Sequence, residues 1–181
     1  MRLFLAINFN KNIKQKLKNI QKQLKEKTYK GNFSREENFH LTLVFLGEIS
    51  ENKVFLIKNA MDNINTEAFS IAFNKLGVFK RNNKDIWWVG ILENKKLLNM
   101  QKELSLNLLN HGFIIESRKY SPHITLAREV ILKKDFDNDM LSQKFTIPVS
   151  VNEISLMRSE RIHGKLTYTE VYKKSLLTTN N

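Results

Sequence analysis

An apolar run that carries a histidine and a threonine on one side occurs twice in this chain. Residues 39–48, Phe-His-Leu-Thr-Leu-Val-Phe-Leu-Gly-Glu, hold β-branched and aromatic residues, no proline and a glycine near the end, which is typical of a β-strand. Side chains alternate between the two faces of a strand, so His40 and Thr42 are predicted to share one face with Val44. The opposite face would carry Leu41, Leu43 and Phe45.

The same pattern returns in the second half of the chain. Residues 121–128, Ser-Pro-His-Ile-Thr-Leu-Ala-Arg, again place a histidine, His123, two positions before a threonine, Thr125, inside an apolar run. The chain contains four histidines, and two of them fall in this short pattern. We therefore interpret the two runs as paired functional strands.

Length and composition limit the possible fold and location. A chain of 181 residues, 41% hydrophobic and 27% charged, is expected to form a single globular domain over residues 1–181. It lacks cysteine, which excludes disulfides and a thiol nucleophile, and it lacks an apolar run of about 20 residues that could span a membrane. We expect a cytoplasmic monomer that needs no protein partner.

The net charge of +12 predicts an anionic partner, with nucleic acid as the first candidate. The lysines are spread along the sequence, so composition alone accounts for the charge equally well.

Hydrophobic periodicity predicts an α+β fold. The expected strands are residues 2–8, 39–48, 69–73 with 77–79, 85–91, 113–116, 121–128, 145–157 and 165–172; the expected helices are 11–27, one that follows Ser50, and one from Leu97 to Leu108 that Gly112 ends. Residues 28–38 are predicted to be a polar loop, 129–142 a short helix or loop, and 158–164 a connection. Each half contains helices, a mostly antiparallel sheet and one histidine strand, so we predict two pseudo-symmetric lobes around a central cleft.

Two imidazoles in one cleft would suit acid–base chemistry on a phosphate. Histidine titrates near neutral pH, so one ring can accept a proton from an attacking oxygen while the other gives a proton to a leaving oxygen. The hydroxyls of Thr42 and Thr125 could donate to the remaining phosphate oxygens, and Arg128 could add a charge-assisted contact. Arg128 is three residues after Thr125, so strict alternation places it on the opposite face of the strand. It reaches the cleft only if the strand ends or bends there.

Other readings of these residues stay open. A histidine on a strand is often only a hydrogen-bonded structural residue, and threonine is common in strands. His111 and His163 are expected to be non-catalytic, and no carboxylate stands at ligand spacing beside His40 or His123, so we predict no metal site. The candidates for stacking on a base are Phe45, the pair Trp87 and Trp88, and, less directly, Phe33 and Tyr120.

The two motifs together resemble those of the 2H phosphoesterases. His-Leu-Thr-Leu-x-Phe-Leu-Gly-Glu from His40 and Pro-His-Ile-Thr-Leu-Ala-Arg up to Arg128 are most similar to the bacterial and archaeal RNA 2′,3′-cyclic phosphodiesterases, also called 2′-5′ RNA ligase-like proteins. The opening residues 1–7 and the segment 156–168 are similar as well. Two details depart from that family: Phe33 stands where a tryptophan is common, and residues 157–160 replace a frequent Glu-Ser.

The resemblance implies a bilobal fold and hydrolysis of a terminal RNA 2′,3′-cyclic phosphate to a 2′-phosphomonoester, without metal or cofactor, with reverse 2′-5′ ligation as a related reaction. It implies that His40 and His123 are the catalytic pair, with His123 favoured as the base and His40 as the acid, and that Thr42, Thr125 and Arg128 bind phosphate. The expected partner is RNA with such ends, tRNA fragments among them. The alternatives are an RNA-binding module without catalysis and a 2H phosphodiesterase that acts on a small cyclic or 2′-5′-linked nucleotide.

Overall fold

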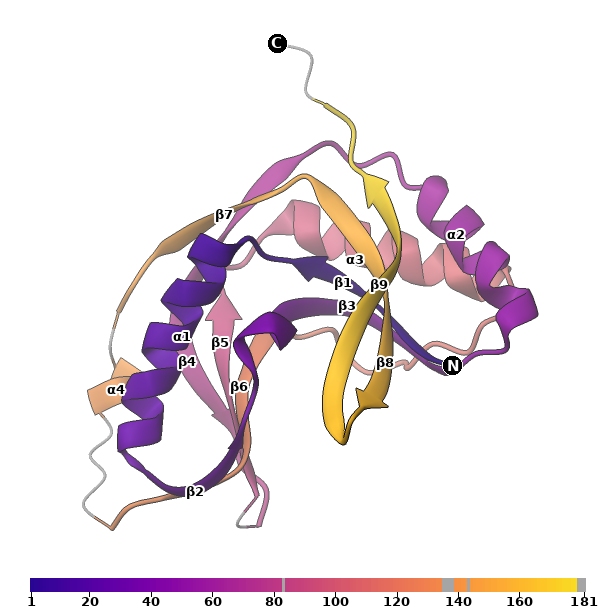
Figure 1. The fold of residues 1–181 in the computed structure, drawn as a ribbon. Coiled ribbons are helices and arrows are strands. Elements are labelled where there is room, and N and C mark those ends of the chain that lie inside the picture. The colour runs from indigo at the N-terminus through magenta and orange to yellow at the C-terminus, as the bar shows by residue number, and fades with distance from the viewer. Residues whose placement is uncertain (83, 135–138, 143, 179–181) are drawn as a thin grey trace.

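The computed structural model describes residues 1–82, 84–134, 139–142 and 144–178 of the chain. Two antiparallel sheets form two lobes, with the helices packed against their outer sides (Figure 1). One sheet, here called sheet A, has the order β3 (His40–Glu48), β1 (Arg2–Asn8), β8 (Glu153–Ile162) and β9 (Lys165–Ser175). The other, sheet B, has the order β2 (Thr28–Phe33), β6 (His123–Leu132), β5 (Asp85–Ile91), β4 (Phe69–Phe79) and β7 (Ile147–Val151).

The helices are α1 (Lys11–Glu26), α2 (Val54–Asp62), α3 (Lys95–Asn110) and the short α4 (Asp139–Ser142), with 3-10 turns η1 (Glu36–Asn38) and η2 (Glu51–Lys53). The Asn10 side chain caps α1 by accepting from the Ile13 N–H at 2.9 Å, and Asn94 caps α3 in the same way. No helix in the described part of the chain combines the length and apolarity that a membrane crossing requires.

The two lobes are related by a pseudo-two-fold arrangement of strands. The order β3-β1-β8-β9 corresponds to β6-β5-β4-β7, and β2 is added at the free edge of β6. The unit β1-α1-β3 corresponds to β5-α3-β6, and in each unit the helix crosses to the other lobe: α1 packs on β2 and β6, and α3 packs on β3. The predicted α+β class with two lobes is confirmed, but the lobes are not the two halves of the sequence.

Several predicted elements were wrong. Strand β6 runs on to Leu132, although residues 129–142 were predicted to be a short helix or loop, and residues 135–138 of that stretch lie outside the described residues. Residues 28–33 form strand β2 rather than a loop, because the outer edge of β6 offers an antiparallel partner. Residues 113–116 form no strand: Phe113 packs into the core after α3, while the side chain of Ile114 is 94% exposed. Residues 145–157 divide between β7 in sheet B and β8 in sheet A, and β8 continues to a tight turn at His163 and Gly164, both with positive φ.

Candidate functional site

The first motif lies on β3, and a backbone carbonyl holds the Nδ1 side of its imidazole. His40 Nδ1 lies 2.8 Å from the Asn38 carbonyl oxygen, and an N–H at Nδ1 would donate to it. In that tautomer His40 Nε2 accepts from the Thr42 hydroxyl at 3.0 Å. Asn38 is itself fixed, because its side chain donates to the Leu166 carbonyl of β9 at 2.9 Å. The ring is thus directed with Nε2 away from the backbone.

The second motif on β6 repeats this arrangement. His123 Nδ1 lies 2.8 Å from the Ser121 carbonyl oxygen, again two residues earlier in the chain. Both imidazoles therefore have Nδ1 held by the backbone, which leaves Nε2 on the other side of the ring, and both are partly accessible rather than sealed in a core.

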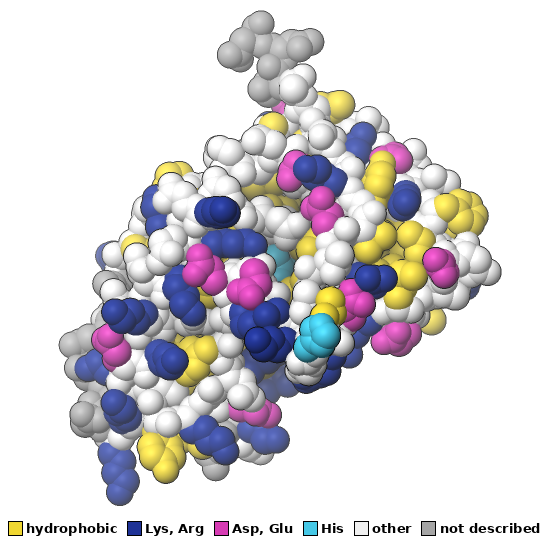
Figure 2. Space-filling model, in the orientation of Figure 1, with side chains coloured by type: hydrophobic (Ala, Val, Ile, Leu, Met, Phe, Trp, Pro, Cys, Tyr) yellow, Lys and Arg dark blue, Asp and Glu magenta, His cyan; other side chains and the backbone are white. Residues whose placement is uncertain are grey.

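The fold brings the two motifs together. Strands β3 and β6 are in contact across the lobes, and the Tyr120 hydroxyl, three residues before His123, donates to the Thr42 carbonyl at 2.9 Å. Figure 2 shows that the surface is hollowed between the lobes, with a histidine side chain recessed inside the hollow. The charge of His123 contributes to lowering the pKa of His40, as expected for rings that lie near each other.

A β-bulge in each strand changes which residues face the site. On β3, Thr42 is paired with Ala6 and Val44 with Leu5, so Leu43 is an extra residue. Val44 is consequently buried, and Phe45, 46% exposed, joins the face of His40. The predicted parity, with Val44 on the open face and Phe45 on the core face, was wrong for this reason.

The bulge on β6 has the same effect. Thr125 is paired with Trp88 and Ala127 with Trp87, which makes Leu126 the extra residue. Arg128 is therefore exposed on the face of His123 and Thr125, and its positive charge lowers the pKa of both His40 and His123. Phe45 and Arg128 thus occupy equivalent positions, each five residues after its histidine.

Each bulge carbonyl is bonded by a glutamine of the helix that crosses from the other lobe. The buried Gln21 of α1 donates to the Leu126 carbonyl at 2.8 Å and to the Ser34 carbonyl at 2.7 Å. Gln101 of α3 donates to the Leu43 carbonyl at 3.4 Å. The regular apolar spacing of residues 13, 17, 20 and 24 gave no sign of this buried role for Gln21.

Aromatic rings flank each imidazole, and sequence reasoning missed most of them. His40 lies against Phe4, with ring centroids 4.8 Å apart, and against Tyr168 at 5.0 Å in an edge-on contact. His123 lies against Phe79 at 5.1 Å, edge-on, and near Trp88 at 6.1 Å. Of the two adjacent tryptophans Trp87 is buried, whereas Trp88 reaches the site face.

Burial lowers the pKa of both imidazoles. The pKa of His40 falls from 6.5 to about 4, mainly through burial and then through the charges of Lys14, His123 and Arg128, against a raising effect of the Asn38 carbonyl. The pKa of His123 is also lowered, mainly by burial, with added effects of Arg128 and Arg118. Both rings are therefore neutral near pH 7 in the free protein.

The remaining candidates lie elsewhere. His111 follows the end of α3, with Nδ1 2.7 Å from the Asn107 carbonyl oxygen, and His163 sits in the β8–β9 turn. Phe33 lies under the Lys25 ammonium, 5.8 Å from the ring centroid. Among the described residues no group of three or more His, Cys, Asp or Glu side chains is arranged to hold a metal ion.

Comparison with known proteins places this arrangement in a family. A family profile described as LigT-like phosphoesterase matches residues 7–88. An RNA 2′,3′-cyclic phosphodiesterase of Thermotoga maritima is 34% identical over 131 residues, which cover 71% of this chain and 70% of that protein. The chain belongs to the LigT-like phosphoesterase family. A Methanocaldococcus jannaschii protein of the same name is 37% identical over 129 residues, 71% of each chain.

Solved structures agree on the fold of this phosphoesterase. Escherichia coli LigT superposes with a TM-score of 0.81 at 23% identity and covers 97% of both chains. A protein of Thermus thermophilus gives a TM-score of 0.84 at 22% identity over 99% of this chain and 100% of that one. These likenesses confirm the bilobal 2H phosphoesterase fold.

Proposed function

We propose that this phosphoesterase hydrolyses the terminal 2′,3′-cyclic phosphate of RNA to a 2′-phosphomonoester. The observation that carries the proposal is the pair of motif strands, in which each histidine presents Nε2 and Arg128 adds a positive charge that acts on both rings. The curated relatives of this chain bear the name of that activity, and E. coli LigT, which shares the fold, has been solved with 3′-AMP. The net charge of +12 supports an RNA substrate.

The step needs one proton acceptor and one proton donor on opposite sides of phosphorus. A water oxygen attacks phosphorus and loses a proton to one neutral imidazole, while the bond from phosphorus to O3′ breaks and O3′ takes a proton from the other, protonated imidazole. Each transfer contributes roughly 10²–10⁴-fold to the rate. Thr42, Thr125 and Arg128 hold the two non-bridging oxygens, where negative charge increases.

We assign His123 as the base and His40 as the acid. The hydrogen bond that holds His40 is partly buried and the one that holds His123 is exposed, so solvent water reaches His123 more readily. Binding of an anionic phosphate between the rings raises the pKa of both and so favours the one protonated imidazole that the reaction requires. A substrate with sulfur in place of O3′ needs no acid; we expect it to restore much of the activity of His40→Ala and little of that of His123→Ala.

The base next to the cyclic phosphate has two aromatic platforms. Phe45 is exposed on the site face and lies under the Arg2 guanidinium, 5.0 Å from the ring centroid. Trp88 lies beside His123 on the other lobe. We propose Phe45 as the stacking residue because its ring is exposed on the site face. Stacking of a base on an aromatic ring contributes about 1–3 kcal/mol.

The deciding experiment is hydrolysis of an oligonucleotide that ends in a 2′,3′-cyclic phosphate, with chelator present. We expect a 2′-phosphate product, loss of roughly 10³-fold or more in His40→Ala and in His123→Ala, and smaller losses in Thr42→Ala and Thr125→Ala. RNA binding without turnover would support a binding module instead, and faster turnover of a small cyclic or 2′-5′-linked nucleotide would support the other alternative. Reverse ligation, tRNA fragments as substrate, the monomeric state and a cytoplasmic location stay predictions.

A further inference from the structure

Five lysines of α1 line up along one side of the helix. Lys11, Lys14, Lys18, Lys22 and Lys25 follow one another at intervals of three or four residues, so they fall within an arc of about 80° at 3.6 residues per turn. We call these five residues the lysine stripe. It lies beside the buried row of Ile13, Leu17, Gln21 and Leu24, which fixes the direction in which it faces.

Glu36 and Glu37 act on the charge of Lys14, but helix α1 itself carries far more positive than negative charge. Helix α1 holds six lysines and one acid, Glu26, whereas α3 holds three lysines and one acid and α2 one of each. None of the ion pairs between described residues involves a lysine of α1. Figure 2 shows Lys and Arg side chains gathered over the lobe that contains α1 and β2.

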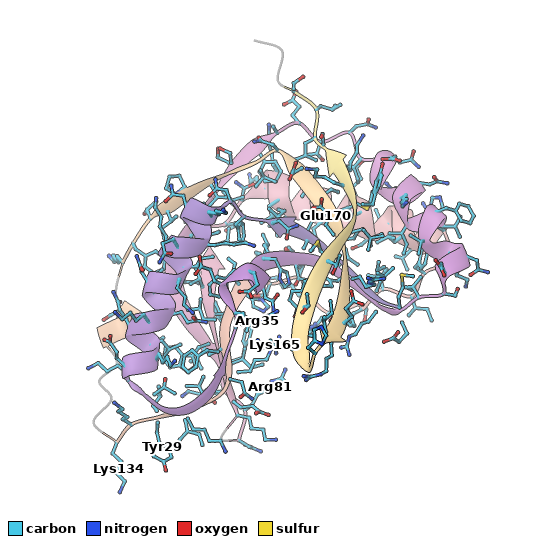
Figure 3. All side chains as sticks on the ribbon, in the orientation of Figure 1. Tyr29, Arg35, Arg81, Lys134, Lys165 and Glu170 are labelled. Atoms are coloured by element: carbon cyan, nitrogen blue, oxygen red, sulfur yellow. The ribbon has the colours of Figure 1, made fainter. Side chains whose placement is uncertain are left out.

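The stripe passes close to His40 at its second member, Lys14. Lys14 donates to the Glu37 carbonyl at 2.9 Å, three residues before His40, and its charge contributes to lowering the pKa of His40. At the end of the stripe, Lys25 lies over the ring of Phe33. From Lys14 to Lys25 the stripe extends about 16 Å along the helix axis. Arg35, on the segment between Phe33 and His40, donates to the Leu166 carbonyl at 2.7 Å, and Figure 3 shows it in the region of Lys165.

We propose that the lysine stripe binds the backbone phosphates of the RNA beyond the terminal nucleotide. The inference rests on the proposed function and deepens it: the enzyme prefers a polynucleotide end to a cyclic mononucleotide, because only a longer strand reaches the stripe. The contacts are to phosphates, so they raise affinity for any sequence and weaken with salt.

The test uses Lys22→Gln/Lys25→Gln, which removes two exposed charges distant from the histidines. The matched control is Lys95→Gln/Lys102→Gln, which removes two exposed charges from α3. For a single-stranded oligonucleotide that ends in a 2′-phosphate, we expect Kd to rise roughly five- to tenfold in the α1 variant and to stay near wild type in the control. The slope of log affinity against log salt, between about 50 and 200 mM, should become less steep by about 1.4. For a 2′,3′-cyclic mononucleotide, kcat/KM should be unchanged in both variants.

If the α1 variant binds the oligonucleotide as tightly as wild type, the lysine stripe does not bind RNA phosphates. An equal loss of affinity in the α3 control would contradict the proposal as well. The failure of the proposed function is a separate result: wild type would then bind the oligonucleotide through α1 yet hydrolyse no cyclic phosphate.

Discussion

The lowered pKa values of the two imidazoles lead us to expect a pH optimum for the enzyme below 7. The proposed reaction needs one ring neutral and one protonated, so we expect kcat/KM to follow a bell between the two apparent pKa values of the pair. The pKa of His40 is about 4 and that of His123 lies below 6.5, so activity should fall on the alkaline side as the last imidazole proton is lost. We expect a maximum in kcat/KM between these values for a cyclic mononucleotide. A maximum above pH 7 would contradict the burial of the site.

Gly77 on β4 leaves room for the Trp88 indole, which lies flat across the sheet. A Cβ at this position would overlap the six-membered ring of Trp88, and the ring would have to move away from its place near His123. We expect Gly77→Ala to lower the free energy of unfolding by about 1–3 kcal/mol and to reduce kcat/KM. Chemical denaturation and the hydrolysis assay would measure the two effects. Gly31→Ala on β2 is the control, because its Cβ would meet its nearest neighbour at 3.2 Å and little need move.

At the scale of elements, the bulges are the features that alternation alone does not predict. The positions of both motif strands follow from composition, because β-branched and aromatic residues surround each histidine. The extra residues Leu43 and Leu126 are apolar, as many residues of both runs are, so nothing in the sequence marks where the ladder shifts. Without the bulge Arg128 would face the core. The sequence predicted that Arg128 reaches the site only if the strand bends, and the bulge provides that bend. The sequence did not show that a bulge would form there.

Gln21 and the Ser34 N–H both donate to the Leu126 carbonyl of the second bulge. The amide hydrogens of Gln21 bond two carbonyls, and its oxygen accepts from the Lys18 ammonium at 3.0 Å, so all its polar atoms are used although the side chain is buried. We expect Gln21→Met to cost about 1–3 kcal/mol of stability, because it leaves the Ser34 carbonyl without this donor. We also expect a fall of roughly tenfold in kcat/KM, because Arg128 loses its fixed position.

The effect of Gln21 on activity can be assigned to Arg128 with a double-mutant cycle. If Gln21 acts by positioning Arg128, then Gln21→Met has little further effect on kcat/KM in the Arg128→Met background. Additive losses would mean that Gln21 only stabilises the lobe. Gln23→Met is the control, since Gln23 is exposed on the same helix two residues away.

At the scale of the molecule, the crossing of α1 and α3 explains what the order of elements could not reveal. The alternation of helix and strand predicted two lobes, and sheet-forming residues predicted most strands. Each half of the sequence, however, gives a helix to the other lobe, because the helix after β1 packs on β6 and the helix after β5 packs on β3. Strand β2 was missed because its polar residues, such as Lys30 and Asn32, suit an edge strand as well as a loop.

Tyr120 joins the lobes directly beside the two histidine motifs. It approaches from the segment before His123 and donates to the Thr42 carbonyl at 2.9 Å, and burial raises its pKa, so the hydroxyl stays protonated and able to donate. Tyr120→Phe keeps the ring and removes this bond alone. We expect a loss of about 1 kcal/mol in the free energy of unfolding.

The larger effect of Tyr120→Phe should be on kcat. Thr42 and His40 sit on one lobe and Thr125 and His123 on the other, so in-line attack depends on the register between lobes, and a displacement of about 1 Å is enough to cost 10²-fold. We expect kcat for a cyclic mononucleotide to fall roughly tenfold and KM to change less, because the phosphate keeps its contacts within each lobe. Tyr29→Phe, on a ring 79% exposed in β2, should change neither quantity. An unchanged kcat in Tyr120→Phe would show that the remaining contacts between β3 and β6 hold the two imidazoles in register without this hydrogen bond.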